Sequence, residues 1–446
     1  MTYLPLTDRE RVEMLARIGV PSTETLFQAV PEEVRYPELR LPAPLSEPEI
    51  LAELRALGAQ NVAVTDRACF LGAGACNHFV PSIVAHITSR SEFYTAYTPY
   101  QPEISQGTLQ VIFEYQTMIA RLTGMDVSNA SHYDGATALA ESLIMAQGVA
   151  RGRRSRAVLA PSVNPVYREV ARTYLQGTDV EIIDEGCGVT PQDWAAAVDD
   201  RTACLVVQTP DFYGRILDLR GIAEAVHARG ALLIVLVDPI SLGMLVPPGA
   251  LGADIVIGDG QPLGIGLQYG GPYLGFFACR AEHVRRMSGR VVGQTVDVEG
   301  KRGFVMTLVT REQHIRREKA TSNICTNQGL NVLAAAVYLS ALGRSGLSQV
   351  ANLCYQRAHY AASAIDALPG YSLDGDGLFF KEFVVHCPLP VQELNRRLLD
   401  EFDIIGGLDL STVEAGRERD MLVCVTEMNP RAQIDRLVAA LAEVAK

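Results

Sequence analysis

Two short segments of this chain carry side chains that could bind a charged ring. Asp238 ends the apolar run LLIVLVD, which has the length of a buried strand. A carboxylate is costly to bury there without a partner. That partner could be a protonated ring nitrogen of a ligand, or a backbone N–H group in the turn that follows. The residues alone leave both possibilities open.

The second segment, Ser131 to Thr137, stands at the start of a helix predicted over residues 136–149. Its small residues, Gly135 and Ala136, would leave the backbone N–H groups of the first turn accessible to a phosphate. His132 could stack on a pyridine ring, although a lone histidine is more often structural. Together with Asp238, this pattern is typical of pyridoxal phosphate (PLP) sites, where an aspartate keeps the ring nitrogen protonated.

The elements that must position these residues alternate between apolar strands and helices from about residue 130. Such short, continuously apolar strands predict a mainly parallel sheet covered on both faces, with ligands at the carboxyl ends of its strands. The predicted strands are 156–160, 180–183, 203–208, 232–237, 255–258 and 274–278, and the predicted helices are 136–149, 165–175 and 218–228. Two long helices over 328–366, broken near 343–346, lead to a smaller α/β unit.

Three longer stretches carry a family resemblance. They are ADIVIGDGQPLGIGLQYGGPYLG (253–275), FYTAYTPYQPEISQGTLQVIFEYQTMIARLTG (93–124) and REKATSNICTNQGL (317–330). The chain resembles glycine decarboxylase, the P-protein of the glycine cleavage system, over essentially its whole length. The resemblance implies an α/β fold of the PLP-transferase type (fold type I, as in aspartate aminotransferase), with a large domain, a small C-terminal domain and an N-terminal helical extension.

The resemblance also points to one half of the family's enzyme. The family occurs as one long chain or as two subunits, and this chain is similar to the N-terminal half, or subunit 1. The other half carries the lysine that forms a Schiff base with PLP, and the aligned position here is Pro262, which has no amine. The chain has four lysines, Lys301, Lys319, Lys381 and Lys446. None of them sits in a turn soon after the sheet strand that follows Asp238, so we expect none to replace the anchor.

A half without an anchor can still complete its partner's site. The stretch from Tyr94 to Glu103 predicts an ordered loop, because its aromatics and prolines show no helical period. Residues expected to reach the partner's pocket are Tyr97, Thr98, Tyr100, Gln101 and Glu103. The alternative is an aromatic interface patch without catalytic contact.

Two further groups are assigned by the resemblance. Thr321, Ser322 and Asn323 would cross the interface to the phosphate of the partner's PLP, or cap a helix starting near Thr326, and both roles can coexist. A vestigial cofactor site in this chain would contain His132, Gly135, Ala136 and Asp238.

The resemblance implies that glycine loses CO2 on PLP and that its aminomethyl group passes to the lipoyl arm of H-protein. The expected partners are a PLP-bearing subunit 2, glycine and lipoylated H-protein, in an assembly with two copies of each subunit. A second hypothesis is a pseudoenzyme that only stabilises or regulates its partner. A third is a self-sufficient PLP lyase or transferase that uses an unusual lysine.

The composition and the sequence patterns also argue against several other classes of function. The formal net charge of −12 argues against non-specific nucleic-acid binding. We find neither a long apolar membrane-spanning run nor a signal-peptide pattern, so we expect a cytoplasmic protein without membrane contact. The nine cysteines form no C-x-x-C pair. Cys69, Cys76 and His78 are spaced too loosely for a zinc site, and we expect no metal.

Domain boundaries follow from these patterns. Residues 1–129 are expected to form the helical extension and the interface loop, and 130–330 the large domain. Residues 331–369 would be connecting helices, and 370–446 the small C-terminal domain. Near the start, Thr7-Asp-Arg-Glu10 predicts a capping box for a helix that Gly19 closes.

Overall fold

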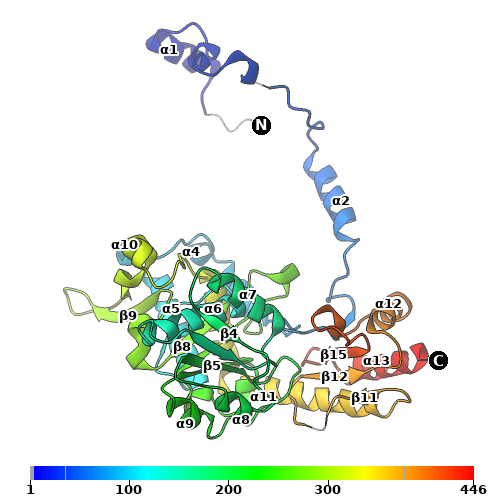
Figure 1. Ribbon diagram of the computed structural model, residues 1–446. Coiled ribbons are helices and arrows are strands. Elements are labelled where there is room, and N and C mark those ends of the chain that lie inside the picture. Colours follow the sequence, from blue (N-terminus) through cyan, green and yellow to red (C-terminus); the bar gives the residue numbers. More distant parts are fainter. Residues whose placement is uncertain (1–4, 36, 376, 446) are drawn as a thin grey trace. The chain divides into compact units, whose positions relative to one another are not determined.

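A seven-stranded sheet forms the centre of the computed structural model, which describes residues 5–35, 37–375 and 377–445 (Figure 1). The strand order is β2-β8-β7-β6-β5-β3-β4, and β8 runs antiparallel to both of its neighbours while the other pairs are parallel. The strands are β2 (Val127–Ser128), β3 (Arg156–Leu159), β4 (Glu181–Ile183), β5 (Thr202–Gln208), β6 (Leu232–Leu236), β7 (Ile255–Asp259) and β8 (Gly275–Cys279). The predicted mainly parallel α/β fold is confirmed.

Helices cover both faces of this sheet. Figure 1 shows α6 (Gly135–Val149) and α7 (Pro165–Leu175) on one side, with α8 (Pro191–Ala196) and α9 (Ile222–His227) on the other. The chain reverses its direction across the sheet between β3 and β5, because β4 lies outside β3 while β6 and β7 follow on the other side. Ligand sites of doubly wound sheets lie at the carboxyl ends of the strands near such a reversal.

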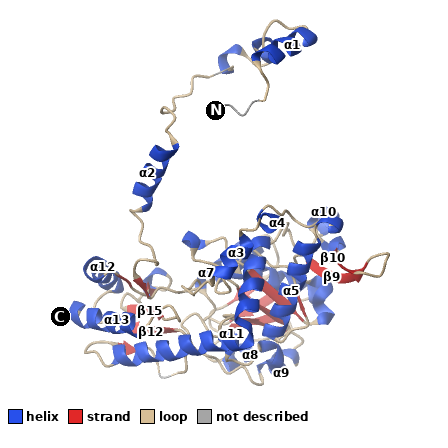
Figure 2. Ribbon diagram, turned by 180° about the vertical axis from the view of Figure 1, so that it is seen from behind, coloured by secondary structure: helices blue, strands red, loops and turns tan. Residues whose placement is uncertain are grey.

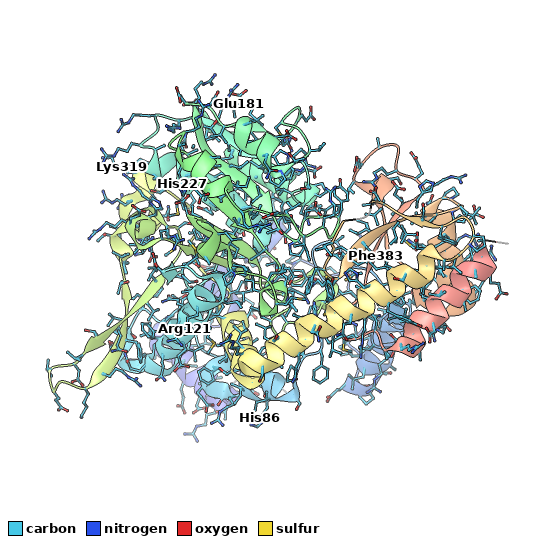
Figure 3. All side chains as sticks on the ribbon, turned by 90° about the horizontal axis from the view of Figure 1, so that it is seen from below. His86, Arg121, Glu181, His227, Lys319 and Phe383 are labelled. Atoms are coloured by element: carbon cyan, nitrogen blue, oxygen red, sulfur yellow. The ribbon has the colours of Figure 1, made fainter. Side chains whose placement is uncertain are left out.

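A long helical element, α11 (Gly329–Asp366), connects the large and small domains. Its one non-helical residue is Gly343 (φ 58°, ψ −172°), so the predicted break is confirmed at the first of the expected glycines. The element meets the length and hydropathy of a membrane span, but its apolar side chains contribute to the cores of both domains. Figure 3 shows it running beside the small-domain strand that carries Phe383.

The small domain is an antiparallel sheet packed against helices. Its strand order is β11-β12-β15-β14, and α12 (Val391–Phe402) and α13 (Arg431–Val444) complete it. The strands are β11 (Ser372–Leu373), β12 (Glu382–His386), β14 (Leu408–Asp409) and β15 (Asp420–Cys424). A segment far upstream joins this domain, since β1 (Ala68–Cys69) pairs in parallel with β13 (Ile404–Ile405).

Other elements lie between these two domains in sequence or precede them. The antiparallel hairpin of β9 (Val291–Val296) and β10 (Arg302–Thr307) was not predicted, and it packs against α5 (Gln106–Thr123), as Figure 2 shows from behind. The remaining short helices are α3 (Ser82–Thr88), α4 (Ser91–Tyr94) and α10 (Gln313–Arg316). Because α5 and β2 pack on the large domain, residues 106–128 of the expected extension belong structurally to that domain.

Residues 1–62 form a separate compact unit, and residues 63–446 form the other. The first unit contains α1 (Asp8–Ile18) and α2 (Glu47–Gly58), both with capping boxes, at Thr7/Glu10 and at Ser46/Glu49. Neither helix has a buried residue. The predicted first helix, closed by Gly19 in the left-handed conformation, is confirmed.

Candidate functional site

A polar cavity lies where β5, β6 and β7 end, the place at which this fold type binds its ligands. Its walls come from both the large and the small domain, because the segment just before β12 reaches across to β6. The residues that matter below are Asn164, Tyr167, Gln208, Asp238, Asp259, Pro262, Lys381 and Glu382, all of which line it.

Asp238 has its partner within the protein. Its Oδ2 lies 2.5 Å from Lys381 Nζ, and the Lys381 side chain is only 3% exposed. Burial alone would lower the pKa of Lys381, but the Asp238 carboxylate outweighs it and raises that pKa well above its usual value. Burial likewise opposes ionisation of Asp238, yet Lys381 lowers the pKa of this carboxyl. The two groups therefore form a charged pair.

A hydrogen-bonded chain extends from this pair into the small domain. Lys381 Nζ donates to His78 Nε2 at 2.9 Å, because an ammonium group can only donate. His78 then donates from Nδ1 to Glu427 Oε2 at 2.8 Å, and Cys354 Sγ approaches the same oxygen at 3.2 Å. The chain ties β6, the segment after β1, α11 and the end of β15 together at one buried point.

This chain also bears on metal binding. The donor atoms of His78, Cys354 and Glu427 lie close enough together to hold an ion, and so do those of Cys76, Glu382 and Cys424. Both ring nitrogens of His78 already have protein partners, and Glu382 accepts a hydrogen bond from the Ala73 N–H at 2.6 Å. We assign no metal to either group.

The start of α6 is occupied as well. Gly135 N donates to Asp259 Oδ2 at 2.9 Å, and Gln261 N donates to Asp259 Oδ1 at 2.8 Å. Asp134 accepts from Thr137 N at 2.8 Å and so caps the same helix. Burial raises the pKa of Asp259 to about 7. The first turn of α6, where we expected room for a phosphate beside Gly135 and Ala136, is thus filled by carboxylates from the chain itself.

The anchor position carries no amine. Pro262 lines the cavity three residues after β7 ends at Asp259. Among the described lysines, Lys301 is exposed and pairs with Glu299, and Lys319 is exposed on a different cavity of the large domain, labelled in Figure 3. Lys446 lies outside the described residues. Of the three described lysines, only Lys381 lines the cavity, and its ion pair with Asp238 opposes the loss of a proton that an imine requires.

The contacts described above can be compared with the groups that a protein must provide to bind PLP. The cofactor needs an amine for its aldehyde, a carboxylate for its ring nitrogen and donors for its phosphate. Here the anchor position, Pro262, has no amine, and the carboxylate of Asp238 is paired with Lys381. The N–H group of Gly135 already donates to Asp259. The residues of this cavity do not fit PLP.

His132 lies elsewhere. Its side chain is fully buried, with Nε2 3.2 Å from both Asn129 Nδ2 and Ser288 Oγ, and its ring meets Phe277 edge-on at 5.0 Å. Burial lowers its pKa to about 3, so the ring is neutral. His132 is absent from the cavity lining, and the structure does not bring it to Asp238. Stacking on a pyridine ring has no support in this geometry.

The aromatic segment 94–103 is largely exposed and mostly irregular, between the end of α4 and a short helical turn at Pro102–Ile104. Tyr97 is 84% exposed and Tyr100 is 49% exposed. Gln101 and Glu103 are also exposed, and Thr98 is half-buried. Tyr97 and Thr98 line an apolar cavity together with Phe93, Tyr94, Pro99, Leu330 and Leu333. The aromatic side chains of this segment are therefore exposed, and other residues of the same structural unit do not cover them.

Arg290 was missed by the sequence interpretation, and it holds this segment in place. The side chain is 5% exposed. Its Nη2 donates to Tyr100 Oη at 2.8 Å and to the Cys325 carbonyl, and its Nη1 lies 3.3 Å from Thr326 Oγ1. The sequence around Arg290, MSGRVV, carries no signal that sets this arginine apart. One buried guanidinium thus joins the aromatic segment to the stretch that precedes α11.

The segment 321–323 is placed next to that stretch. Ser322 Oγ donates to Glu141 Oε1 at 2.6 Å, which fixes the segment against α6, while Thr321 and Asn323 are exposed. The expected capping role is wrong, because α11 begins at Gly329 after Gln328 and has no side-chain cap. Its start lies too far along the chain for a Thr321 or Asn323 cap.

A cavity beside this segment is strongly cationic. It is lined by Arg285, Arg286, Arg311, Arg316, Lys319, Thr321 and Ser322, with Glu312 among them. It stands out in a chain whose net charge is −12. An arrangement of this kind favours anionic groups, which agrees with the expectation that Thr321 and its neighbours approach a phosphate on another chain.

Comparisons with known proteins agree with this geometry. The chain matches the family described as glycine cleavage system P-protein over residues 1–441. It is 56% identical to a probable glycine dehydrogenase (decarboxylating) subunit 1 from Thermomicrobium roseum, covering 99% of both chains. It is 53% identical to a protein of the same description from Desulforamulus reducens, covering 100% of both.

Solved structures show the same fold. A crystal structure of glycine decarboxylase (P-protein) of the glycine cleavage system, in inhibitor-bound form, has a TM-score of 0.90 and 43% identity, with complete coverage of both chains. A sphingosine-1-phosphate lyase from Burkholderia pseudomallei has a TM-score of 0.65 and 17% identity, covering 93% of this chain and 94% of that one. The second likeness concerns the fold alone.

Proposed function

From the premise that the chain belongs to the glycine cleavage system P-protein family, we propose that it is subunit 1 of a two-subunit glycine decarboxylase and anchors no cofactor itself. A second subunit holds PLP covalently, and this chain completes that subunit's active site. Glycine is decarboxylated there, and the aminomethyl group passes to the lipoyl arm of H-protein. A cytoplasmic location is part of the same proposal.

One observation carries the proposal: the chain's own cavity has Pro262 at the anchor position and Lys381 engaged with Asp238. A chain with this fold and these relatives, but with a cavity that does not fit PLP, can take part in the family's reaction only through another chain's cofactor. The exposed aromatic segment and the cationic cavity are the parts of its large domain suited to that role.

Within the proposed complex, this chain's residues bind and orient. The aromatic segment offers rigid surface that would exclude water where the partner's pocket opens. Thr321, Ser322 and the arginines beside them would contact an anionic group of the partner's site. Arg290 keeps the two segments at a fixed separation, because it bonds to both.

Reconstitution tests the proposal. Glycine decarboxylation is measured with PLP and lipoylated H-protein for this chain alone, for subunit 2 alone and for their mixture. We expect activity in the mixture only. Turnover by this chain alone would favour the self-sufficient enzyme and contradict the proposal.

Tyr97→Ala distinguishes a contribution to the active site from scaffolding. Tyr97 is 84% exposed, so its loss should change the chain's unfolding free energy by less than about 0.5 kcal/mol. We expect turnover of the mixture to fall roughly 10-fold or more, because the partner's pocket loses an aromatic wall. Steady-state rates and the amount of complex are measured in parallel.

Val189→Ala is the matched control, since Val189 is 83% exposed and lies before α8. It should leave turnover unchanged. If Tyr97→Ala also forms the complex normally and turns over at the wild-type rate, and Tyr100→Ala and Gln101→Ala do the same, the scaffold hypothesis is favoured instead.

A further inference from the structure

The cavity of this chain is shaped by a fold that holds PLP in other proteins, and each charged contact such a cofactor would need is already made by a side chain. Two side chains make these contacts: Lys381, just before β12, and Asp259, at the end of β7. Pro262, three residues after Asp259, provides no amine. All three line one cavity with Asp238. Their coincidence in one place is the observation that needs an explanation.

The first contact is at Asp238. In a PLP enzyme a carboxylate in this position pairs with the protonated ring nitrogen. Here a cation is paired with it permanently, since Lys381 Nζ lies 2.5 Å from Oδ2 and is buried from solvent. His78 supports the ammonium on its other side at 2.9 Å. A ring nitrogen could reach Asp238 only by displacing Lys381, which would leave the buried ammonium without its carboxylate, and an unpaired buried charge is costly.

The second contact is at the first turn of α6, which has the geometry to receive a phosphate. The Asp259 carboxylate accepts from Gly135 N there, and it is 9% exposed. A side chain on Gly135 would be 2.8 Å from Tyr167 Oη and 3.0 Å from Asp259 N, so these groups fill the space directly against the helix start. A phosphate would meet the carboxyl group of Asp259 and the ring of Tyr167 in place of free N–H groups.

We propose that Lys381 and Asp259 are resident substitutes for the two charged ends of a cofactor, and that they keep this second site of the enzyme permanently closed to PLP. Lys381 takes the place of the ring nitrogen at Asp238, and Asp259 takes the place of the phosphate at α6. The inference goes beyond the proposed function, because it concerns what occupies this chain's own cavity and not what the chain does for its partner.

The ion pair between Lys381 and Asp238 also connects the two domains. Lys381 belongs to the segment that enters the small domain, whereas Asp238 ends β6 of the large domain. Together with His78 and Glu427, the pair holds the two domains against each other without a ligand. A PLP-binding protein of this fold would have the cofactor at that point, and this chain has an ion pair.

The first test counts cofactors. Equilibrium dialysis with PLP, read by absorbance, is applied to the full chain alone and to its complex with subunit 2. We expect no stoichiometric PLP on the chain and one PLP for each pair of different subunits. A second PLP per pair that is lost in Asp238→Asn of this chain would overturn the proposal.

The second test measures whether the stability of the complex depends on a positively charged partner for Asp238. Lys381→Ala should lower the melting temperature of the complex, and propylammonium should restore part of it, because this ion supplies the missing charge and most of the missing length. We expect a recovery of about 2–4 °C over the same concentration of sodium chloride. Wild type and the double variant Lys381→Ala/Asp238→Asn should show no such recovery. An equal response in all three would contradict a cation site.

A third comparison covers the case in which Lys381→Ala does not fold. Lys381→Met keeps most of the volume, and the double variant Lys381→Met/Asp238→Asn removes both charges. The double variant should melt higher than Lys381→Met, since it leaves no unpaired carboxylate. A double variant that melts lower by the sum of both single effects would overturn the proposal. None of these measurements uses turnover, so they can fail while the proposed function stands.

Discussion

Replacing Arg290 by methionine is expected to reduce turnover of the reconstituted enzyme by at least ~30-fold, since misplacing site residues by as little as 1 Å can cost about 100-fold. Arg290 is buried and bonds to Tyr100 Oη, the Cys325 carbonyl and Thr326. Methionine keeps an unbranched apolar stem but is shorter and donates no hydrogen bond, so both segments lose their shared support. The loss of charge-assisted hydrogen bonds should also lower the unfolding free energy by about 3 kcal/mol.

The control is Arg396→Met on α12, where the arginine is 66% exposed and pairs only loosely with Asp400. It should change neither rate nor stability measurably. Arg290→Lys should fall between wild type and Arg290→Met, because it keeps the charge but cannot donate to both segments at once. Wild-type turnover in a folded Arg290→Met complex would show that the two segments do not serve the partner's site.

Replacing Gly214 by alanine is expected to be the most destabilising of the small substitutions. Gly214 has φ +90°, and a Cβ there would lie 1.8 Å from the Glu382 carbonyl oxygen. Its own carbonyl accepts from Phe380 N at 3.0 Å, so this glycine is where the segment carrying Lys381 crosses the large domain. We expect a loss of at least about 3 kcal/mol, measured by urea unfolding, as the backbone moves apart.

Gly221→Ala separates backbone strain from the close approach. Gly221 has φ +79°, but a Cβ there would meet nothing within 4 Å. It should cost only about 1 kcal/mol, the price of a left-handed conformation for alanine. Equal losses for Gly214→Ala and Gly221→Ala would mean that the contact with Glu382 is not tight and that the two domains are not held closely at this point.

The central sheet was predictable because its strands are short, apolar and bounded by turn residues, and the helix at Pro165 begins and ends as expected. The β9–β10 hairpin could not be predicted from the sequence. Val291 and Val292 are buried, but the rest of β9 is largely exposed and polar, so its sequence lacks the pattern of a core strand. Its pairing is set by contact with α5, which no local signal reveals.

The residues of the candidate site likewise fall into those that the sequence reveals and those that it does not. Asp238 could be singled out because it ends a recognisable strand, and Pro262 because the family resemblance aligns it with the anchor lysine. Both residues line the cavity. Lys381 could not be placed there, since 143 residues separate it from Asp238 and only the crossing at Gly214 brings them together. Arg290 escaped notice for a related reason: its partners lie on two distant segments, and a single arginine carries no periodic signal.

The measurement that tests the central claim most directly is borohydride reduction of the working complex with PLP and glycine decarboxylation confirmed beforehand, followed by mass analysis of both subunits. We predict a pyridoxyl label on one lysine of subunit 2 and none on this chain. A stoichiometric label on Lys381 or another lysine of this chain would contradict the account, because it would show that the chain anchors a cofactor of its own.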